Sequence, residues 1–202
     1  SEFHTSFALE KNGGYLALTR PDGMGGTEIV HEFAPYGEQP EDVSFGLFGE
    51  MPPLASGYFL NPTPNAANDA SAVTGFVADT EFSIDRGFYD VAQSVVVTSA
   101  TPGASIIYTT DSTLPRESPL NGTRVDGPNA LTPPSATVLI GGTTVLRAMA
   151  VKTSFQPTDV DTQTYIFTND VLSQGTPSQP FQNWGSEGPD WAMDSSVVNH
   201  SN

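Results

Sequence analysis

The residue types in this chain that could carry chemistry are mainly carboxylates, with a small number of histidines. The sequence contains 23 Asp and Glu residues, three His residues and no cysteine. The lack of cysteine excludes disulfides, thiolate zinc sites and a cysteine nucleophile. His31-Glu32 begins like the helix of a zinc protease, but the second histidine of that motif is missing and Pro35 opposes a helix. We therefore interpret His31 as part of a strand face.

Pairs of acids are the other candidates for catalysis. Glu41/Asp42 and Asp159/Asp161 are close in sequence, but two carboxylates act as general acid and base only when a fold holds them across a cleft. The chain has neither a Gly-x-Ser-x-Gly sequence nor a glycine-rich phosphate loop that leads into a helix. From these residues we expect no catalytic residue, no cofactor and no enzymatic activity.

Calcium is the metal that this composition favours, because hard cations bind clustered oxygen ligands. The candidate ligands are the loop acids Asp111, Asp126, Asp159 and Asp161, with Glu117 as a further acid of the same region. None of them follows the regular Asp-x-Asp-x-Asp-Gly spacing of a calcium loop. Two interpretations remain open, a calcium site and diffuse solvation of acidic loops, and the spacing favours solvation.

Aromatic side chains beside polar groups are typical of carbohydrate-binding sites. Trp184 and Trp191 are the main candidates because both lie in a segment without strand alternation, and Tyr58, Tyr36 and Tyr89 are further candidates. Core packing is the competing interpretation for the tyrosines. Docking onto the sandwich or onto a neighbouring domain is the competing interpretation for the two tryptophans.

The overall charge limits the partners. Seven Lys and Arg residues leave a net charge of −16, which repels phosphate backbones and anionic lipid headgroups. No apolar run approaches the roughly 18 residues that span a bilayer. We therefore expect neither nucleic acid binding nor membrane insertion. An acidic chain rich in Thr, Ser, Gly and Pro, with few lysines, favours an extracellular or cell-surface location.

Short strands dominate the second half of the chain. Between 81 and 168, runs of β-branched and aromatic residues predict about seven strands of a β-sandwich and no helix. Residues 94–99 and 106–110, joined by a Pro-Gly turn, predict a hairpin. Residues 137–140 and 143–151, joined by Gly-Gly, predict a second one.

Alternation within these strands predicts which side chains are buried. Leu146, Ala148 and Ala150 should face the core, and Arg147 should face outward. Asp111 stands where a strand ends, and its carboxylate is expected to accept hydrogen bonds from the following residues in an Asx-type turn.

The first half of the chain has weaker strand signals. Residues 7–9 and 15–18, separated by Asn-Gly-Gly, predict a hairpin. A second turn at 20–23 precedes another short strand at 28–33.

Composition places the module boundaries. Residues 1–68 and 81–168 carry the strand patterns, and 69–80 are small, polar residues that predict a linker. Residues 169–202 lose the alternation, which predicts an irregular tail or the lead into an absent domain. The expected fold class is all-β, with two immunoglobulin-like or fibronectin-III-like sandwich modules.

Five ordered signals carry a family resemblance in the second module. They are "RGFYD" at 86–90, "YTTD" at 108–111, "LNGTRVDGP" at 120–128, "VLRAMA" at 145–150 and "TQTYIF" at 162–167. In this order they resemble the chitobiase/β-hexosaminidase C-terminal-type module, which implies a fibronectin-III-like sandwich. The chain departs from the pattern at Ser112, where glycine is usual, and at Val125, where tyrosine is usual.

A second resemblance covers residues 1–68. The stretches that carry it are "FHTSFALEKNGGYLALTRPDG", "EFAPYGEQPEDVSFG" and "GYFLNPTPNAAN". These stretches are similar to the C-terminal part of a bacterial lamin-tail domain, an immunoglobulin-like sandwich whose first strands are missing here. Such a module implies an open edge that a partner or the missing segment covers. Residues 169–199 resemble the stretch that leads toward a spore-coat-protein-H-like kinase domain, without that kinase's catalytic core.

These observations together predict a non-catalytic segment of a large secreted or cell-surface protein, with a structural, adhesion or spacer role. Its partners would be neighbouring domains of a larger chain or another protein subunit. Two alternatives remain open. One is a polysaccharide-binding accessory module of an extracellular enzyme, and the other is a subunit of an extracellular assembly whose neighbour completes the N-terminal sandwich.

Overall fold

The computed structural model describes residues 7–49, 52–68 and 72–173. Within them the protein has fourteen strands and one short helix, which confirms the predicted all-β class. In this part of the chain, no helical segment has the length and hydropathy that a bilayer-spanning helix needs. The chain divides into two compact units, Ser1–Gly75 and Phe76–Asn202.

The described residues of the first unit form two antiparallel strand pairs. Strand β1 (Gly14–Pro21) pairs with β2 (Thr27–Tyr36), and β3 (Ser44–Phe48) pairs with β4 (Ala55–Phe59). His31 lies in β2, so its interpretation as part of a strand face is confirmed.

One carboxylate closes the turn that joins β1 to β2. Asp22 Oδ1 accepts hydrogen bonds from the backbone N–H groups of Met24 and Gly26, both at 2.8 Å. The hairpin predicted between 7–9 and 15–18 is wrong, since β1 pairs instead with the strand that follows it. The physical reason is this Asp-centred turn, which fixes a reversal after β1.

Aromatic side chains pack the first unit. Tyr36, Tyr58 and Phe59 are buried. The Phe45 ring contacts the rings of Phe33 and Tyr58, with centroids 5.4 and 4.9 Å apart. Tilted ring pairs of this kind add roughly 0.5–1.5 kcal/mol beyond the burial of their area. The rings therefore connect β2 to the β3–β4 pair.

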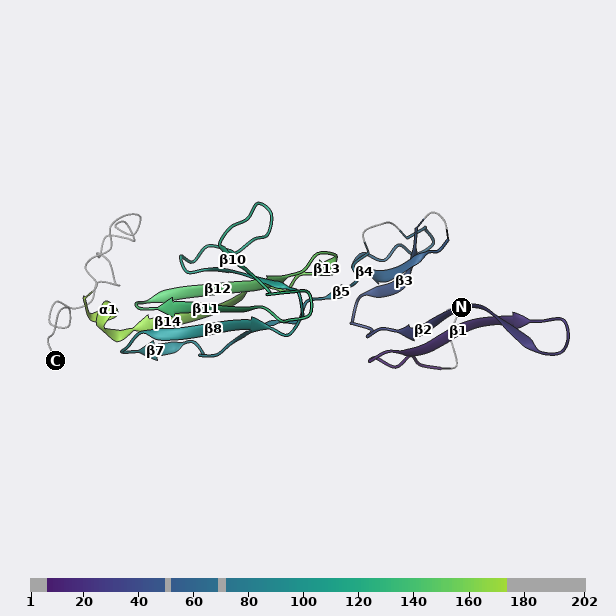
Figure 1. Cartoon of the computed structure of the whole chain (residues 1–202), viewed down its shortest axis with the longest axis horizontal. Helices are drawn as coiled ribbons and strands as arrows, with labels where there is room; N and C mark the ends of the chain where they lie inside the picture. Colours follow the sequence, from purple (N-terminus) through teal and green to yellow (C-terminus); the bar gives the residue numbers. More distant parts are fainter. Residues whose placement is uncertain (1–6, 50–51, 69–71, 174–202) are drawn as a thin grey trace, which may run out of the picture. The chain divides into compact units, whose positions relative to one another are not determined.

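The second unit contains a sandwich of two sheets. Its strands are β6 (Thr80–Phe82), β7 (Gly87–Tyr89), β8 (Gln93–Ser99), β9 (Ser105–Thr109), β10 (Thr123–Asp126), β11 (Ser135–Ile140), β12 (Thr144–Val151) and β14 (Asp161–Phe167). One sheet has the order β10-β9-β12-β14-β7 and the other has the order β11-β8-β6. All neighbours are antiparallel except β14 and β7, which are parallel. The long strands run along one direction (Figure 1), as in sandwiches with aligned sheets.

A further short pair lies beside this sandwich. Strand β13 (Phe155–Gln156) pairs with β5 (Gly75–Phe76). With β13, nine strands lie between Thr80 and Phe167, against the seven or so that were expected. The extra ones are strands of two to four residues, which are too short to produce a clear alternation.

Both hairpins predicted in the second module are wrong. Strands β8 and β9 lie in different sheets, and so do β11 and β12. Their connections cross from one sheet to the other, which places the apolar face of each strand against that of the next. Val95 and Val97 of β8 therefore pack in one cluster with Ile106 of β9. Pro-Gly and Gly-Gly permit either kind of connection, and burial of both apolar faces selects the crossing.

The predicted burial of β12 is confirmed. Leu146, Ala148 and Ala150 are all 0% exposed, and Arg147 is half-buried on the opposite face of the sheet. The main core cluster also contains Tyr165. Burying one large aliphatic side chain contributes about 1.5–3 kcal/mol, so this interface between the sheets is the main source of stability of the second unit.

The chain leaves the sandwich through helix α1 (Thr168–Ser173). Asp170 Oδ2 accepts a hydrogen bond from the backbone N–H of Thr143 at 2.6 Å. The first residues of the predicted tail, 169–173, are thus helical, and the side chain of Asp170 caps the β11–β12 connection. The remainder of the predicted tail, 174–202, lies outside the described residues.

Candidate binding site in the β9–β10 loop

The loop between β9 and β10 begins with the predicted Asx turn. Asp111 Oδ1 accepts hydrogen bonds from Thr113 Oγ1 at 2.6 Å and from the backbone N–H of Thr113 at 3.1 Å. Both bonds lower the pKa of Asp111, and the bond from the Thr113 hydroxyl has the larger effect, because each stabilises the ionised form of the carboxylate. The carboxylate is therefore both charged and fixed in orientation, and the expected turn is confirmed.

Ser112 occupies the position where the resembled family has glycine. Its φ is +68°, a left-handed conformation that glycine adopts freely and that a residue with a Cβ adopts at a cost. The turn thus keeps the backbone conformation that glycine would favour. The departure from the family pattern changes the strain at this position and leaves the turn in place.

The far side of the loop is held by Asn121. Its Nδ2 donates to Leu114 O at 2.7 Å and to Thr113 Oγ1 at 3.1 Å, and its backbone pairs with that of Arg116. The next residue, Gly122, has a φ of +108°, and a Cβ there would lie 2.5 Å from Tyr108 O. Only glycine fits this close approach of β10 to the end of β9.

These elements enclose a small open pocket of about 180 Å³. Its lining is Tyr108, Thr109, Thr110, Asp111, Gly122 and Thr123. The lining combines three threonines, one carboxylate and backbone, while the Tyr108 side chain packs against the main core cluster, like its register partner Ala148. Sequence analysis singled out Asp111 alone and placed Tyr108 in a strand. The signal that could have revealed the pocket is the run Tyr-Thr-Thr-Asp at 108–111. It places polar side chains where β9 ends and the loop begins.

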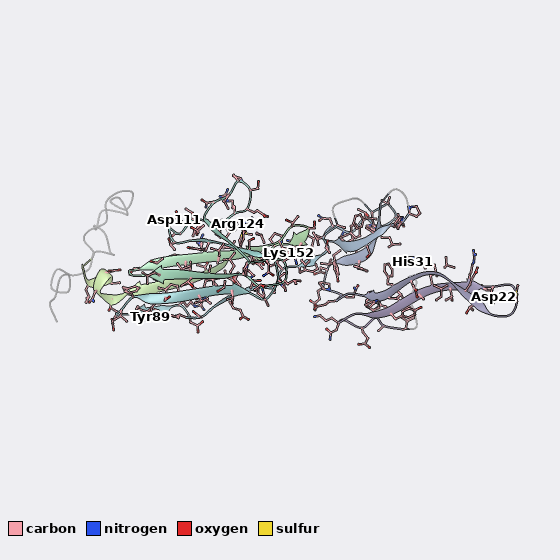
Figure 2. The ribbon with its side chains drawn as sticks, in the orientation of Figure 1. Asp22, His31, Tyr89, Asp111, Arg124 and Lys152 are labelled. Carbon is pink, nitrogen blue, oxygen red and sulfur yellow. The ribbon has the colours of Figure 1, made fainter. Side chains whose placement is uncertain are left out.

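Asp126, a calcium candidate on β10, is paired with a cation. Its Oδ1 accepts from Ser105 Oγ at 2.7 Å and from Arg124 Nε at 2.8 Å. Both bonds lower the pKa of Asp126, and the bond from Ser105 has the larger effect. Arg124 Nη1 also contacts Glu117 Oε1 at 3.1 Å. Asp111 and Arg124 lie on the same side of the second unit, away from Tyr89 (Figure 2).

The structure does not bring the calcium candidates together. Asp161 accepts a hydrogen bond from Thr80 Oγ1, and the backbone oxygen of Asp159 accepts one from Thr158 Oγ1 at 2.8 Å. Over residues 7–49, 52–68 and 72–173, no group of three or more His, Asp or Glu side chains is placed to hold a metal ion.

The tyrosine candidates for a glycan platform are packing residues. Tyr58 is 7% exposed and its Oη donates to Glu38 O at 2.7 Å; burial raises its pKa. Tyr36 is buried, and Tyr89 is half-buried with its ring 5.7 Å from that of Tyr165. Core packing therefore accounts for all three. Trp184 and Trp191 lie outside the described residues.

A second, apolar hollow lies on the β1–β2 hairpin. It measures about 320 Å³ and is lined by Phe7, Leu16, Ala17, Leu18, His31 and Phe33. The His31 ring stands edge-on to Phe33, with centroids 4.9 Å apart. An imidazole among apolar side chains with no other titratable group in the lining offers packing rather than proton transfer.

Comparison with known proteins gives one informative finding. No curated protein and no solved structure matches this chain. The lamin-tail resemblance of residues 1–68 and the spore-coat kinase context find no support in these comparisons. Within the second unit, residues 84–162 match the family model of the Chitobiase/beta-hexosaminidase C-terminal domain, which confirms that part of the resemblance.

Proposed function

We propose that this chain is a non-catalytic structural, adhesion or spacer segment of a larger secreted or cell-surface protein. The observation that carries the proposal is the use of the loop carboxylates. Asp111 closes a turn, Asp126 binds Ser105 and Arg124, and Asp170 caps the β11–β12 connection. Acids that serve their own loops in this way support a scaffold rather than a reaction site.

Its partners in this proposal are neighbouring domains of the larger protein or another subunit. Small rigid sandwiches hold other domains at a set separation, and an acidic surface of net charge −16 suppresses nonspecific association. The lamin-tail identity of residues 1–68 and a following spore-coat-protein-H-like kinase domain belong to this proposal. The proposal includes neither catalysis nor a cofactor.

A domain exchange in the full-length protein tests the spacer role. Residues 81–168 are replaced by an unrelated fibronectin type III domain of similar length, and a second variant deletes them. We expect the exchange to preserve adhesion of cells that carry the protein and the deletion to reduce it. Loss of adhesion in the exchange variant, with normal surface display, would contradict a spacer and show that the sandwich makes specific contacts.

A chelation experiment tests the expectation that no calcium is needed. The unfolding temperature of the chain is measured in calcium chloride and in EDTA. A site occupied by calcium in the folded state would lower this temperature on chelation. We expect equal values, because the candidate acids are held by other groups of their own loops.

Polysaccharide binding is the second candidate function. The family match favours it, because the family takes its name from enzymes that act on carbohydrates. The polar pocket of the β9–β10 loop offers hydroxyl groups and a carboxylate. Pull-down of the chain on insoluble chitin, cellulose and xylan tests this function, and we expect depletion from the supernatant by at least one of the three.

A further inference from the structure

We propose that the pocket of the β9–β10 loop binds a single neutral pyranose unit of a polysaccharide. This inference rests on the second candidate function and adds the site, the residues and the class of sugar. The juxtaposition behind it is the Asp111 carboxylate at the start of the loop and the hydroxyl groups of Thr110 and Thr123, at the end of β9 and the start of β10.

The pocket has free hydrogen-bonding groups of the types that sugars use. Asp111 takes both Thr113 bonds on Oδ1, so Oδ2 is left to accept from a ligand hydroxyl. Thr110 and Thr123 are exposed, and in the described part of the chain neither hydroxyl has a hydrogen-bond partner. Hydroxyl donors bound to a carboxylate form short, strong hydrogen bonds.

The end of β9 that borders the pocket is already held in place. Tyr108 is half-buried and packs against the main core cluster, and β9 is paired on both sides, by β10 and β12. The strand end that borders the pocket is therefore fixed before a ligand binds, so little conformational freedom is lost on binding.

The polar walls are fixed as well. Thr113 orients the Asp111 carboxylate, and the amide of Asn121 ties the two sides of the loop together. Thr109 Oγ1 donates to Thr113 O at 2.6 Å, so the strand end and the turn are linked. Preorganised acceptors bind a ligand better than mobile ones because less conformational entropy is lost on binding.

Size and charge select the class of ligand. The volume of about 180 Å³ is smaller than the roughly 300–1,000 Å³ of pockets for drug-sized ligands, so one ring fits and an oligosaccharide does not. No cationic side chain lines the pocket, the nearest ionised lining group is Asp111, and the chain carries a net charge of −16. Uronates and sulfated sugars are therefore repelled.

Binding of one ring at one site is expected to be weak. A dissociation constant on the order of 1 mM, equivalent to about −4 kcal/mol, is realistic for so few contacts. A polymer that presents many identical units to several copies of the module would bind more tightly through effective concentration.

Amide NMR of the 202-residue chain tests the site directly. The probes are the methyl glycosides of glucose, N-acetylglucosamine, galactose, mannose and xylose, with methyl glucuronide as the anionic counterpart. We expect at least one neutral glycoside to shift the amide signals of Thr110, Asp111, Gly122 and Thr123 in a saturable way. Methyl glucuronide should leave them unshifted.

Two substitutions and a matched control identify the groups that bind. Asp111→Asn keeps an oxygen acceptor for Thr113 and removes the charge, and Thr123→Val removes one hydroxyl with little change of shape. We expect each to weaken binding about tenfold, since each removes one hydrogen bond to the sugar. Thr162→Val, at an exposed position of β14 outside the pocket lining, should leave binding unchanged. Unfolding temperatures of all three verify that the variants fold.

The possible outcomes distinguish failure of the proposed pocket from failure of polysaccharide binding itself. The inference is supported if a neutral glycoside shifts the amide signals of the pocket in a saturable way and both substitutions weaken this binding. This holds for whichever insoluble polymer the chain binds. In another outcome, a polysaccharide depletes the chain while the glycosides shift amide signals outside the pocket, or while neither substitution weakens binding. Either result overturns the assignment to this pocket and leaves polysaccharide binding as a function. Absence of both depletion and shifts overturns both. Equal binding of methyl glucuronide overturns the neutral-sugar class.

Discussion

Single residues in this protein show how local chemistry and burial set conformation and charge. Ser112 is held at φ +68° by the turn that Asp111 closes, although a Cβ disfavours that region by roughly 1–2 kcal/mol. Tyr165 is fully buried between the sheets, and its Oη donates to Ile84 O at 2.7 Å. The first residue carries strain and the second carries a buried titratable group, so each yields a prediction.

Replacing Ser112 with glycine should stabilise the second unit. Relief of the left-handed strain outweighs the extra entropy of glycine in the unfolded chain, and we expect a gain of about 0.5–1 kcal/mol. The measurement is the free energy of unfolding in urea. Ser135→Gly, in the exposed start of β11, is the control and should destabilise by about 0.5–1 kcal/mol. Destabilisation by both changes would show that Ser112 is not strained.

Tyr165 should make the second unit sensitive to alkali. Burial raises its pKa to about 12, against about 10 in an unfolded chain. The folded state therefore holds the phenol proton more tightly than the unfolded state. This contribution is fully present below pH 10 and is lost as the pH rises through 12.

The Tyr165→Phe variant separates that effect from general alkaline denaturation. It loses the bond to Ile84 O, so its free energy of unfolding at pH 7 should fall by about 1 kcal/mol. Between about pH 10 and 12 its stability should decline less steeply than that of the unmodified protein. Urea unfolding at several pH values measures both quantities, and parallel alkaline slopes would contradict the assignment.

At the scale of elements, β12 shows which parts of the fold alternation predicts. Leu146, Ala148 and Ala150 face the core as expected, because the period of a strand is two and one face of this sheet is covered. The partner of the strand was predicted wrongly. Neither β8–β9 nor β11–β12 is a hairpin, since Pro-Gly and Gly-Gly allow a reversal within a sheet as readily as a crossing between sheets.

The two leucines Leu146 and Leu139 provide a matched test of this packing. Leu146 in β12 is 0% exposed, and Leu139 in β11 is 75% exposed. Leu146→Ala should lower the free energy of unfolding by about 2–5 kcal/mol, because it leaves a cavity between the sheets. Leu139→Ala should change it by less than about 0.5 kcal/mol. Comparable losses in urea unfolding would mean that the assignment of core and surface faces is reversed.

At the scale of the whole molecule, the two units differ in the size of their cores. In the described residues, the buried hydrophobic side chains of the first unit are Tyr36, Tyr58 and Phe59, and the others all lie in the second unit. The first unit also exposes large apolar side chains on its hairpin, among them Leu18 and Ile29. Stability scales with the apolar area buried, so the units should differ in stability.

Urea unfolding followed by residue-resolved NMR should therefore show two transitions. We expect the amide signals of β3 and β4 to lose native intensity at a lower urea concentration than those of β8 and β12. Tyr165→Phe should move the second transition and leave the first in place, because its contacts lie within the second unit. One transition shared by all residues would show that the two units unfold as one cooperative body.

The sequence by itself determined the all-β class, the buried face of β12, the Asx turn at Asp111 and the resemblance of the second module to a family whose model matches residues 84–162. These properties depend on alternation, on turn chemistry and on ordered motifs, all of which are local along the chain. Only the tertiary structure decided which strands share a sheet, that Tyr58 and Tyr36 are core residues, and that Tyr108, Thr110 and Thr123 meet Asp111 around one pocket. Such pairings depend on which apolar faces cover each other, a property of contacts between residues far apart in the sequence.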